Sequence, residues 1–172
     1  IARILFRRLR YTTRDIRSLG GHMKNQLLAA LVLCVGPTLV AAEDVAPGDV
    51  AFSDGAVLAS LTGAVGDAVA GRAAFINRKQ GNCLACHANA EIPEQSFHGE
   101  VGPPLDFVAE RWTAEELRGI VSNAKMMFPD TIMPAFYNGL EPNRSLKKFA
   151  GKTVLSAQQV EDIVAYLQTL SE

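Results

Sequence analysis

The stretch Gly-Asn-Cys-Leu-Ala-Cys-His-Ala-Asn-Ala, residues 81–90, holds two of the chain's three cysteines and one of its three histidines. Two cysteines that are separated by two residues and followed directly by histidine are typical of three kinds of site. These are a metal site, a redox-active disulfide and the covalent attachment site of a haem. Features elsewhere in the chain decide among them.

The order and spacing of Cys83, Cys86 and His87 favour haem attachment. C-x-x-C-H is the attachment signature of c-type haem, because the two thiols can reach the vinyl groups on one edge of a porphyrin and form thioethers. The histidine is then carried beneath the ring, where it can bind iron. A redox pair would follow a strand of a βαβ unit, which is not evident here. A zinc site needs four ligands, and adding His98 gives a cramped set. We therefore expect one covalently attached haem c.

The methionines supply the candidates for a second iron ligand. Met133 lies in a Thr-Ile-Met-Pro-Ala run, whose proline stiffens a loop that must hold a thioether against iron. Met126 and Met127 end a predicted helix, where such a pair more often packs in the core. His98 would give a bis-histidine haem, but we interpret it as a surface loop residue. We expect Met133 to bind opposite His87, and a neutral thioether ligand raises the reduction potential.

Helical periodicity first appears over residues 67–77. Asp67 is the expected N-cap, and the expected apolar face consists of Val69, Ala73 and Ile76. Gly71 and Phe75 lie four residues apart on a neighbouring face. Because glycine has no side chain, Gly71 can let another helix approach, and Tyr166 is placed to pack near that gap.

Two later helices begin with capping boxes, in which two side chains bond each other's backbone amides. Thr113 and Glu116 open the first of these helices, which should end before Pro129, and Ser156 and Gln159 open the second. The apolar stripes are Leu117, Ile120 and Val121 in the first, and Val160, Ile163, Val164 and Leu167 in the second. No strand pattern competes, so the domain should be mainly helical.

The N-terminal part of the chain is read as a set of processed segments. Residues 23–42 have the form of a cleavable signal peptide, with Met23-Lys24, an apolar run and small residues before a cut after Ala42. The run is shorter than the roughly 20 residues that span a bilayer, so we expect no membrane span in the mature form; an uncleaved anchor is the alternative. Residues 1–22 are interpreted as an upstream extension that is not native, with a transit peptide as the weaker idea.

Residues 43–66 are predicted to form an irregular arm that lies across the domain of residues 67–172, with Val57, Leu58 and Leu61 covering apolar surface. Without residues 1–42 the chain keeps 10 basic and 17 acidic residues, a net charge of −7. An acidic domain of this kind is not expected to bind nucleic acid.

From Asp67 onward the chain resembles a class I cytochrome c, and four runs resemble the SoxX family of small haem subunits. These runs are GNCLACH (81–87), GPPLDFVAERWTAEELRGIVSNAK (102–125), FPDTIMPAFY (128–137) and GKTVLSAQQVEDIVAYLQTL (151–170). The third is the most specific. The resemblance implies an all-α class I cytochrome c fold, whose helices pack around one covalently bound haem c rather than on each other.

The resemblance also implies the roles of individual residues. Cys83 and Cys86 attach the haem, His87 is the proximal iron ligand and Met133 the distal one. In class I cytochromes c a proline carbonyl accepts the hydrogen bond from the proximal histidine Nδ1 and so fixes its tautomer. Within Val101-Gly-Pro-Pro-Leu105 either proline can do this, and we favour Pro103; an ordinary proline-rich turn is the alternative.

The function implied by the resemblance is electron transfer in the periplasm during bacterial thiosulfate oxidation. A SoxA-like haem subunit, the expected heterodimer partner, joins thiosulfate to a cysteine of the SoxYZ carrier protein. This chain accepts the electrons and passes them to a downstream cytochrome. The catalytic cysteine of this L-cysteine S-thiosulfotransferase type of complex is expected on the partner, so no catalytic residue is assigned here and whether the chain itself counts as an enzyme stays open.

The alternative function is a freestanding class I cytochrome c that serves a respiratory oxidase, and a zinc-binding module comes third. A freestanding carrier would present a lysine patch, for which Lys147, Lys148 and Lys152 are candidates. A chain that binds a partner tightly instead needs an apolar face of its own around the haem edge. The aromatic candidates for that face, each more often found in a core, are Trp112, Phe136, Tyr137 and Phe149.

Overall fold

The structure is a computed structural model that describes residues 43–138, 147 and 151–172. The predicted upstream extension (1–22) and signal peptide (23–42) lie outside the described residues, as do Lys148 and Phe149. The helices are α1 (Ala68–Ile76), η1 (Cys83–Ala85), α2 (Val108–Arg111), α3 (Ala114–Asn123), η2 (Ala124–Met126) and α4 (Ala157–Leu167). In the described part of the chain the only strand-like pairing is an isolated bridge between Ser53 and Ala56. The prediction of an all-α fold is confirmed.

The predicted helix starts are confirmed by the hydrogen bonds at each N-terminus. The Asp67 side chain accepts from the amides of Val69 and Ala70 at the start of α1. Both capping boxes are complete, so the first amides of α3 and of α4 have side-chain partners. The four apolar residues predicted for the stripe of α4 are all buried. Two short helices, η1 and α2, were not predicted, because three or four residues are too few to show a helical period.

The predicted apolar face of α1 is wrong at two of its three positions, since only Ile76 packs against the core. Val69 is 79% exposed and Ala73 is also exposed, whereas the buried positions are Gly71, Ala74 and Phe75. The physical reason is close helix packing: a Cβ on Gly71 would lie 1.9 Å from the carbonyl oxygen of Asp162 in α4. A face that must touch another backbone selects small residues rather than large apolar ones.

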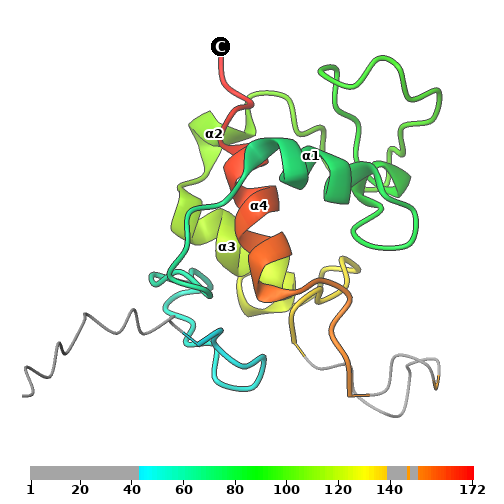
Figure 1. Ribbon diagram of the computed structural model, residues 1–172. Coiled ribbons are helices and arrows are strands. Elements are labelled where there is room, and N and C mark those ends of the chain that lie inside the picture. Colours follow the sequence, from blue (N-terminus) through cyan, green and yellow to red (C-terminus); the bar gives the residue numbers. More distant parts are fainter. Residues whose placement is uncertain (1–42, 139–146, 148–150) are drawn as a thin grey trace, which may run out of the picture. The chain divides into compact units, whose positions relative to one another are not determined.

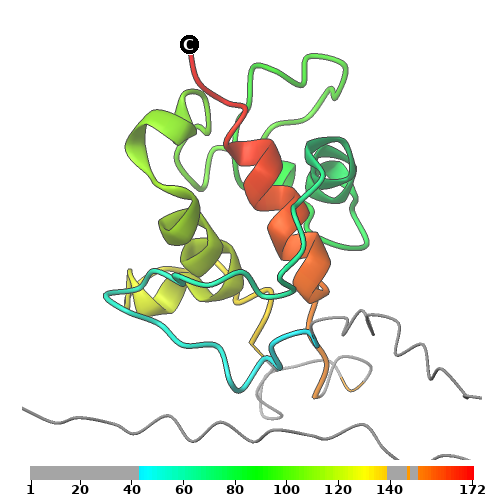
Figure 2. The same ribbon diagram turned by 60° about the vertical axis from the view of Figure 1, so that its left-hand side comes forward.

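Helices α1 and α4 cross in direct contact, as Figures 1 and 2 show from two directions. Beside the Gly71 contact, the rings of Phe75 and Tyr166 pack edge to face, with centroids 5.4 Å apart and an interplanar angle of 66°. The predicted approach at Gly71 and the nearby Tyr166 ring are therefore confirmed. The expectation that the helices pack only around a haem is wrong for this pair.

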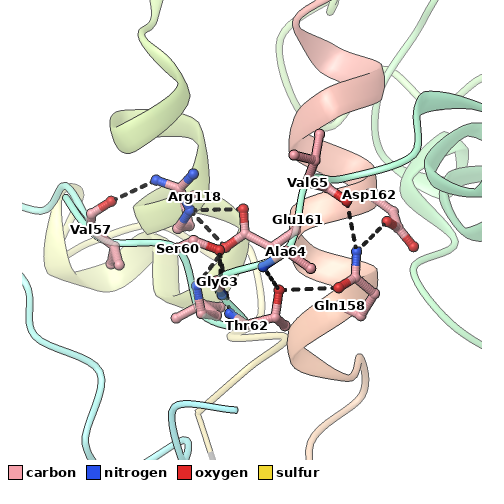
Figure 3. A network of polar contacts seen from close by, with 11 residues as sticks. Val57, Ser60, Thr62, Gly63, Ala64, Val65, Arg118, Gln158, Glu161 and Asp162 are labelled. Carbon is pink, nitrogen blue, oxygen red and sulfur yellow. Dashed lines mark hydrogen bonds and ion pairs between the residues drawn. The ribbon is translucent and has the colours of Figure 1, made fainter. Parts of the chain in front are cut away.

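The arm, residues 43–66, is irregular and is fastened to α3 and α4. Val57 and Leu61 are buried in the core, while Leu58, expected to join them, is exposed. Arg118 of α3 donates to the Val57 carbonyl (2.9 Å), and the Leu61 amide donates to Glu161 of α4 (2.7 Å). Figure 3 shows this network.

The centre of the network is a buried ion pair. The Arg118 Nε lies 2.9 Å from Glu161 Oε1, and the two residues are 9% and 5% exposed. Each member of the pair also has one hydrogen bond to the arm backbone, from Arg118 Nη1 to the Val57 carbonyl and from the Leu61 amide to Glu161 Oε1, so the protein partly replaces the solvation that the two charges lose on burial. The arm is thus held by polar contacts at its backbone as well as by two apolar side chains.

Candidate haem site

A cavity of about 570 Å³ opens between the attachment loop, the helices α2, α3 and α4, and the loop of residues 128–134. Its volume lies within the ~300–1,000 Å³ of typical cofactor sites. The walls are mainly apolar and include Leu105, Val108, Leu117, Val121, Phe136 and Leu167. Cys83, Cys86, His87 and Met133, which the sequence singled out, all line this one cavity.

The attachment loop turns tightly through η1. Asn82 adopts a left-handed conformation (φ 49°), and the amides of Cys86 and His87 both donate to the carbonyl of Cys83, at 3.1 and 3.0 Å. This turn brings the two thiols and the imidazole to the cavity wall, while Leu84 between them is buried in the core. The sequence spacing predicted that the two thiols and the imidazole serve one site, but not the turn through η1 or the burial of Leu84.

His87 is held in one tautomer. Its Nδ1 lies 2.8 Å from the carbonyl oxygen of Pro103. Because a carbonyl only accepts, Nδ1 carries the proton and Nε2 keeps the lone pair that a metal can use. The predicted preference for Pro103 over Pro104 is confirmed. Gly102 makes the close approach possible, since a Cβ there would lie 2.3 Å from the ring's Cε1.

Met133 is half-buried on the opposite loop, where its amide donates to the Thr131 hydroxyl (3.2 Å). The other candidates do not line the cavity. Met126 is 50% exposed, and Met127 packs against Gly55 of the arm. His98 accepts from the Asn89 amide and donates to the Ile92 carbonyl, so both of its ring nitrogens are used within a loop.

The two alternative chemistries of the cysteines find no support in the described residues. Burial raises the pKa of the Cys83 thiol to about 12, so this side chain is a neutral thiol and a poor nucleophile for disulfide exchange. Within the described ranges, no group of three or more histidine, cysteine or acidic side chains is arranged to hold a metal ion.

Two cations near the cavity had no signal in the sequence. Arg111 of α2 donates to the carbonyls of Asp106 (2.8 Å) and Pro104 (2.9 Å), which fixes the proline loop behind His87. Lys125 of η2 donates to two carbonyls of the loop that carries Met133. Their partners are backbone atoms, which every residue has, so no motif could reveal these contacts.

Comparison with known proteins identifies the class. The family model for cytochrome c matches residues 68–171, so the chain belongs to the cytochrome c family. Among solved structures, a chain of SoxXA from P. pantotrophus is 45% identical, with a TM-score of 0.71 over 76% of this chain and 100% of that chain. The chain is a SoxX-like class I cytochrome c, an electron-transfer protein with covalently bound haem c. A search of curated proteins found no match.

The residues present fit this cofactor. Two thiols stand at the wall of a mainly apolar cavity, together with an imidazole whose Nε2 has no protein partner among the described residues and a thioether from the facing loop. One nitrogen and one sulfur donor suit the two axial positions of haem iron.

Proposed function

We propose that Cys83 and Cys86 form the thioether bonds to haem c, and that His87 Nε2 and Met133 Sδ bind its iron from opposite sides. The observation that carries the proposal is that all four residues line one cavity, whereas His98 and Met126 do not. The His87 tautomer, fixed by Pro103, supports the proximal role. Its close fit over Gly102 limits rotation of the imidazole ring.

When bound, the haem supplies an iron that alternates between the ferric and ferrous states. The chain's own contribution is to set the balance between the ferric and ferrous states and to limit rearrangement of the site when the iron changes between them. The apolar walls exclude water, and the neutral thioether of Met133 favours the ferrous state. With His87 and Met133 both supplied by the protein as ligands, an electron would enter and leave without a bond between iron and a substrate.

We propose further that the chain works as the electron-accepting subunit of a SoxAX-type complex in thiosulfate oxidation. The similarity to a chain of SoxXA supports a SoxA-like haem subunit as partner. On that partner, thiosulfate would be joined to a SoxYZ cysteine: an S–H bond breaks, an S–S bond forms, and one proton and two electrons are released. A single haem takes one electron at a time and passes it to a downstream cytochrome.

The surface around the cavity supports a partner. Val101, Phe128 and Ile132 all line the cavity and are exposed. Exposed apolar side chains that cluster at one mouth mark an interaction site more often than isolated ones do. Of the aromatic residues that sequence reasoning offered, Phe136 and Tyr137 are buried core residues and do not contribute. Trp112 is half-buried, lines the cavity and packs edge to face on Phe128, while Phe149 lies outside the described residues.

We propose the periplasm as the location, reached through the signal peptide at residues 23–42. The similarity covers the whole of the matched SoxXA chain but only 76% of this chain. Residues 43–172 make up the same share of this chain, so the matched chain has the length expected after removal of residues 1–42. In the described part of the chain no helix is long and apolar enough to cross a bilayer.

Purification from the native periplasm, followed by absorption spectra and identification of co-purifying chains, tests these proposals. The expected result is a red protein with covalent haem that elutes together with a second haem subunit. Isolation only as a monomer would favour the freestanding carrier, for which the exposed Lys147 and Lys152 could serve as docking charges. A colourless protein from a host with a working haem-ligation apparatus would overturn the haem site itself.

A further inference from the structure

We propose that Lys125 is a positioning residue for the distal iron ligand: its ammonium group holds closed the loop that carries Met133. The inference rests on the proposed ligation by Met133. Its basis is a pair of hydrogen bonds, since Lys125 Nζ donates to the carbonyls of Thr131 (3.1 Å) and Met133 (3.0 Å). The two accepting carbonyls lie on either side of Ile132.

The loop has few other constraints at this point. The Thr131 amide donates to the Phe128 carbonyl (3.0 Å), and the Met133 amide donates to the Thr131 hydroxyl (3.2 Å). Both bonds lie within the loop, so neither ties it to a helix. Ile132 is 80% exposed and adds no burial. Pro134 has no amide hydrogen to donate. After Met133, the next backbone bond to another element runs from the Tyr137 amide to the Ser122 carbonyl (3.0 Å).

Lys125 itself sits on a rigid base. It belongs to η2, which continues directly from α3, and its amide donates to the Asn123 side chain (3.3 Å). Helix α3 forms a wall of the cavity through Leu117 and Val121. The lysine therefore connects the loop that carries the ligand to the wall facing the cofactor. Hydrogen bonds from a charged donor are stronger than those between neutral groups.

The test measures how readily an outside ligand displaces the Met133 sulfur from ferric iron in the complete holoprotein. Imidazole is the probe, and displacement is followed by the loss of the weak far-red absorption band of a methionine–ferric iron bond. In Lys125→Met the loop loses both bonds while the side chain keeps its length. We expect the apparent dissociation constant for imidazole to fall roughly tenfold, the factor that corresponds to about 1.4 kcal/mol.

Lys79→Met is the matched control. Lys79 is an exposed lysine just before the attachment loop, and among the described residues only its backbone amide has a hydrogen bond, to Asn77. The control removes the same charge without touching the Met133 loop, so its imidazole affinity should equal that of the wild type. Lys125→Arg, which keeps several donors on one cation, should move the affinity back toward the wild-type value.

Two results would overturn the positioning role while leaving Met133 ligation intact: an unchanged imidazole affinity in Lys125→Met, or an equal gain in Lys79→Met. A wild-type protein without the methionine–iron band would instead refute the ligation proposal, and the role of Lys125 with it. If Lys125→Met yields no holoprotein, the same titration of Lys125→Gln decides the question by the same criteria.

Discussion

At the scale of single residues, the proposed chemistry depends on which atoms face the cavity. His87 offers a free Nε2 because the Pro103 carbonyl occupies its other nitrogen. Met133 offers the thioether because it lies in the lining while Met126 points elsewhere on the surface. Each assignment predicts the outcome of a single substitution.

Replacing the proposed distal ligand should change the reduction potential. In Met133→His, the soft thioether gives way to imidazole, which stabilises ferric iron better, so the potential should fall markedly. Met126→His is the matched control and should keep the wild-type value, because Met126 does not line the cavity. A potentiometric titration followed by visible absorption measures both. An unchanged potential in Met133→His would remove Met133 from the iron.

The glycine beneath the imidazole of His87, the proposed proximal ligand, gives a second prediction. In Gly102→Ala the added Cβ would lie 2.3 Å from the His87 ring, so the ring must shift and its bond to iron should weaken. We expect a partial loss of the low-spin ferric spectrum. Gly48→Ala provides the comparison, since no atom lies within 4 Å of a Cβ there. Identical spectra for the two variants would show that the ring is not held against Gly102.

At the scale of helices, α1 and α4 meet through backbone rather than through large side chains. Gly71→Ala would place a Cβ 1.9 Å from the Asp162 carbonyl, so the two helices must separate. Forced separation of packed elements costs about 1–3 kcal/mol. Denaturant unfolding should show that loss of stability for Gly71→Ala, and not for Gly48→Ala. Equal stability of both variants would contradict the close contact.

The buried ion pair between α3 and α4 predicts a pattern of non-additive effects. Arg118→Met leaves Glu161 buried without its cation, which should destabilise the protein by about 3–5 kcal/mol. The double variant Arg118→Met/Glu161→Gln removes both charges and should lose less than the sum of the two single variants. Denaturant unfolding of the four proteins in this cycle measures the coupling. Additive losses would mean that the pair contributes nothing as a pair.

Local sequence rules predicted those helix features that depend only on near neighbours. The capping boxes at Thr113 and Ser156 were predictable because both partners lie within four residues. The buried face of α1 was not, since Gly71 is buried by the approach of a helix about ninety residues further along the chain. The Arg118–Glu161 pair was not predictable either, because its two members lie far apart in the sequence. In addition, a charged residue normally indicates a solvent-exposed position and not a buried one.

At the scale of the whole molecule, the residues of the cofactor site could be predicted more completely from the sequence than the contacts that support them. The C-x-x-C-H motif and the downstream prolines identified one wall of the cavity, and the Met-Pro loop identified the other. The hydrogen bonds by which Arg111 and Lys125 hold the loops at the cavity could not be predicted, because their acceptors are main-chain carbonyls. The ligand roles themselves stay predictions until the substitutions above are made.

The direct contact between α1 and α4 predicts the behaviour of the protein without haem. In Cys83→Ser/Cys86→Ser, the cavity of about 570 Å³ has no covalent occupant, and its walls lose their packing partner. Amide hydrogen exchange should then be fast in α3 and in the loop of residues 128–138, while α1 and α4 keep the strongest protection. Uniform fast exchange would show that the helices hold together only through the cofactor.

The fastening of the arm also bears on how the protein matures. The bond from the Leu61 amide to Glu161 joins positions 100 residues apart. A chain that is translocated with its N-terminus first cannot form this bond until nearly all of it has crossed. On the proposed export route, helix α4 would also arrive late, and it supplies Ile163 and Leu167 to the cavity that Cys83 and Cys86 line. Until α4 arrives, the two thiols would face an incomplete cavity that a ligation enzyme could enter.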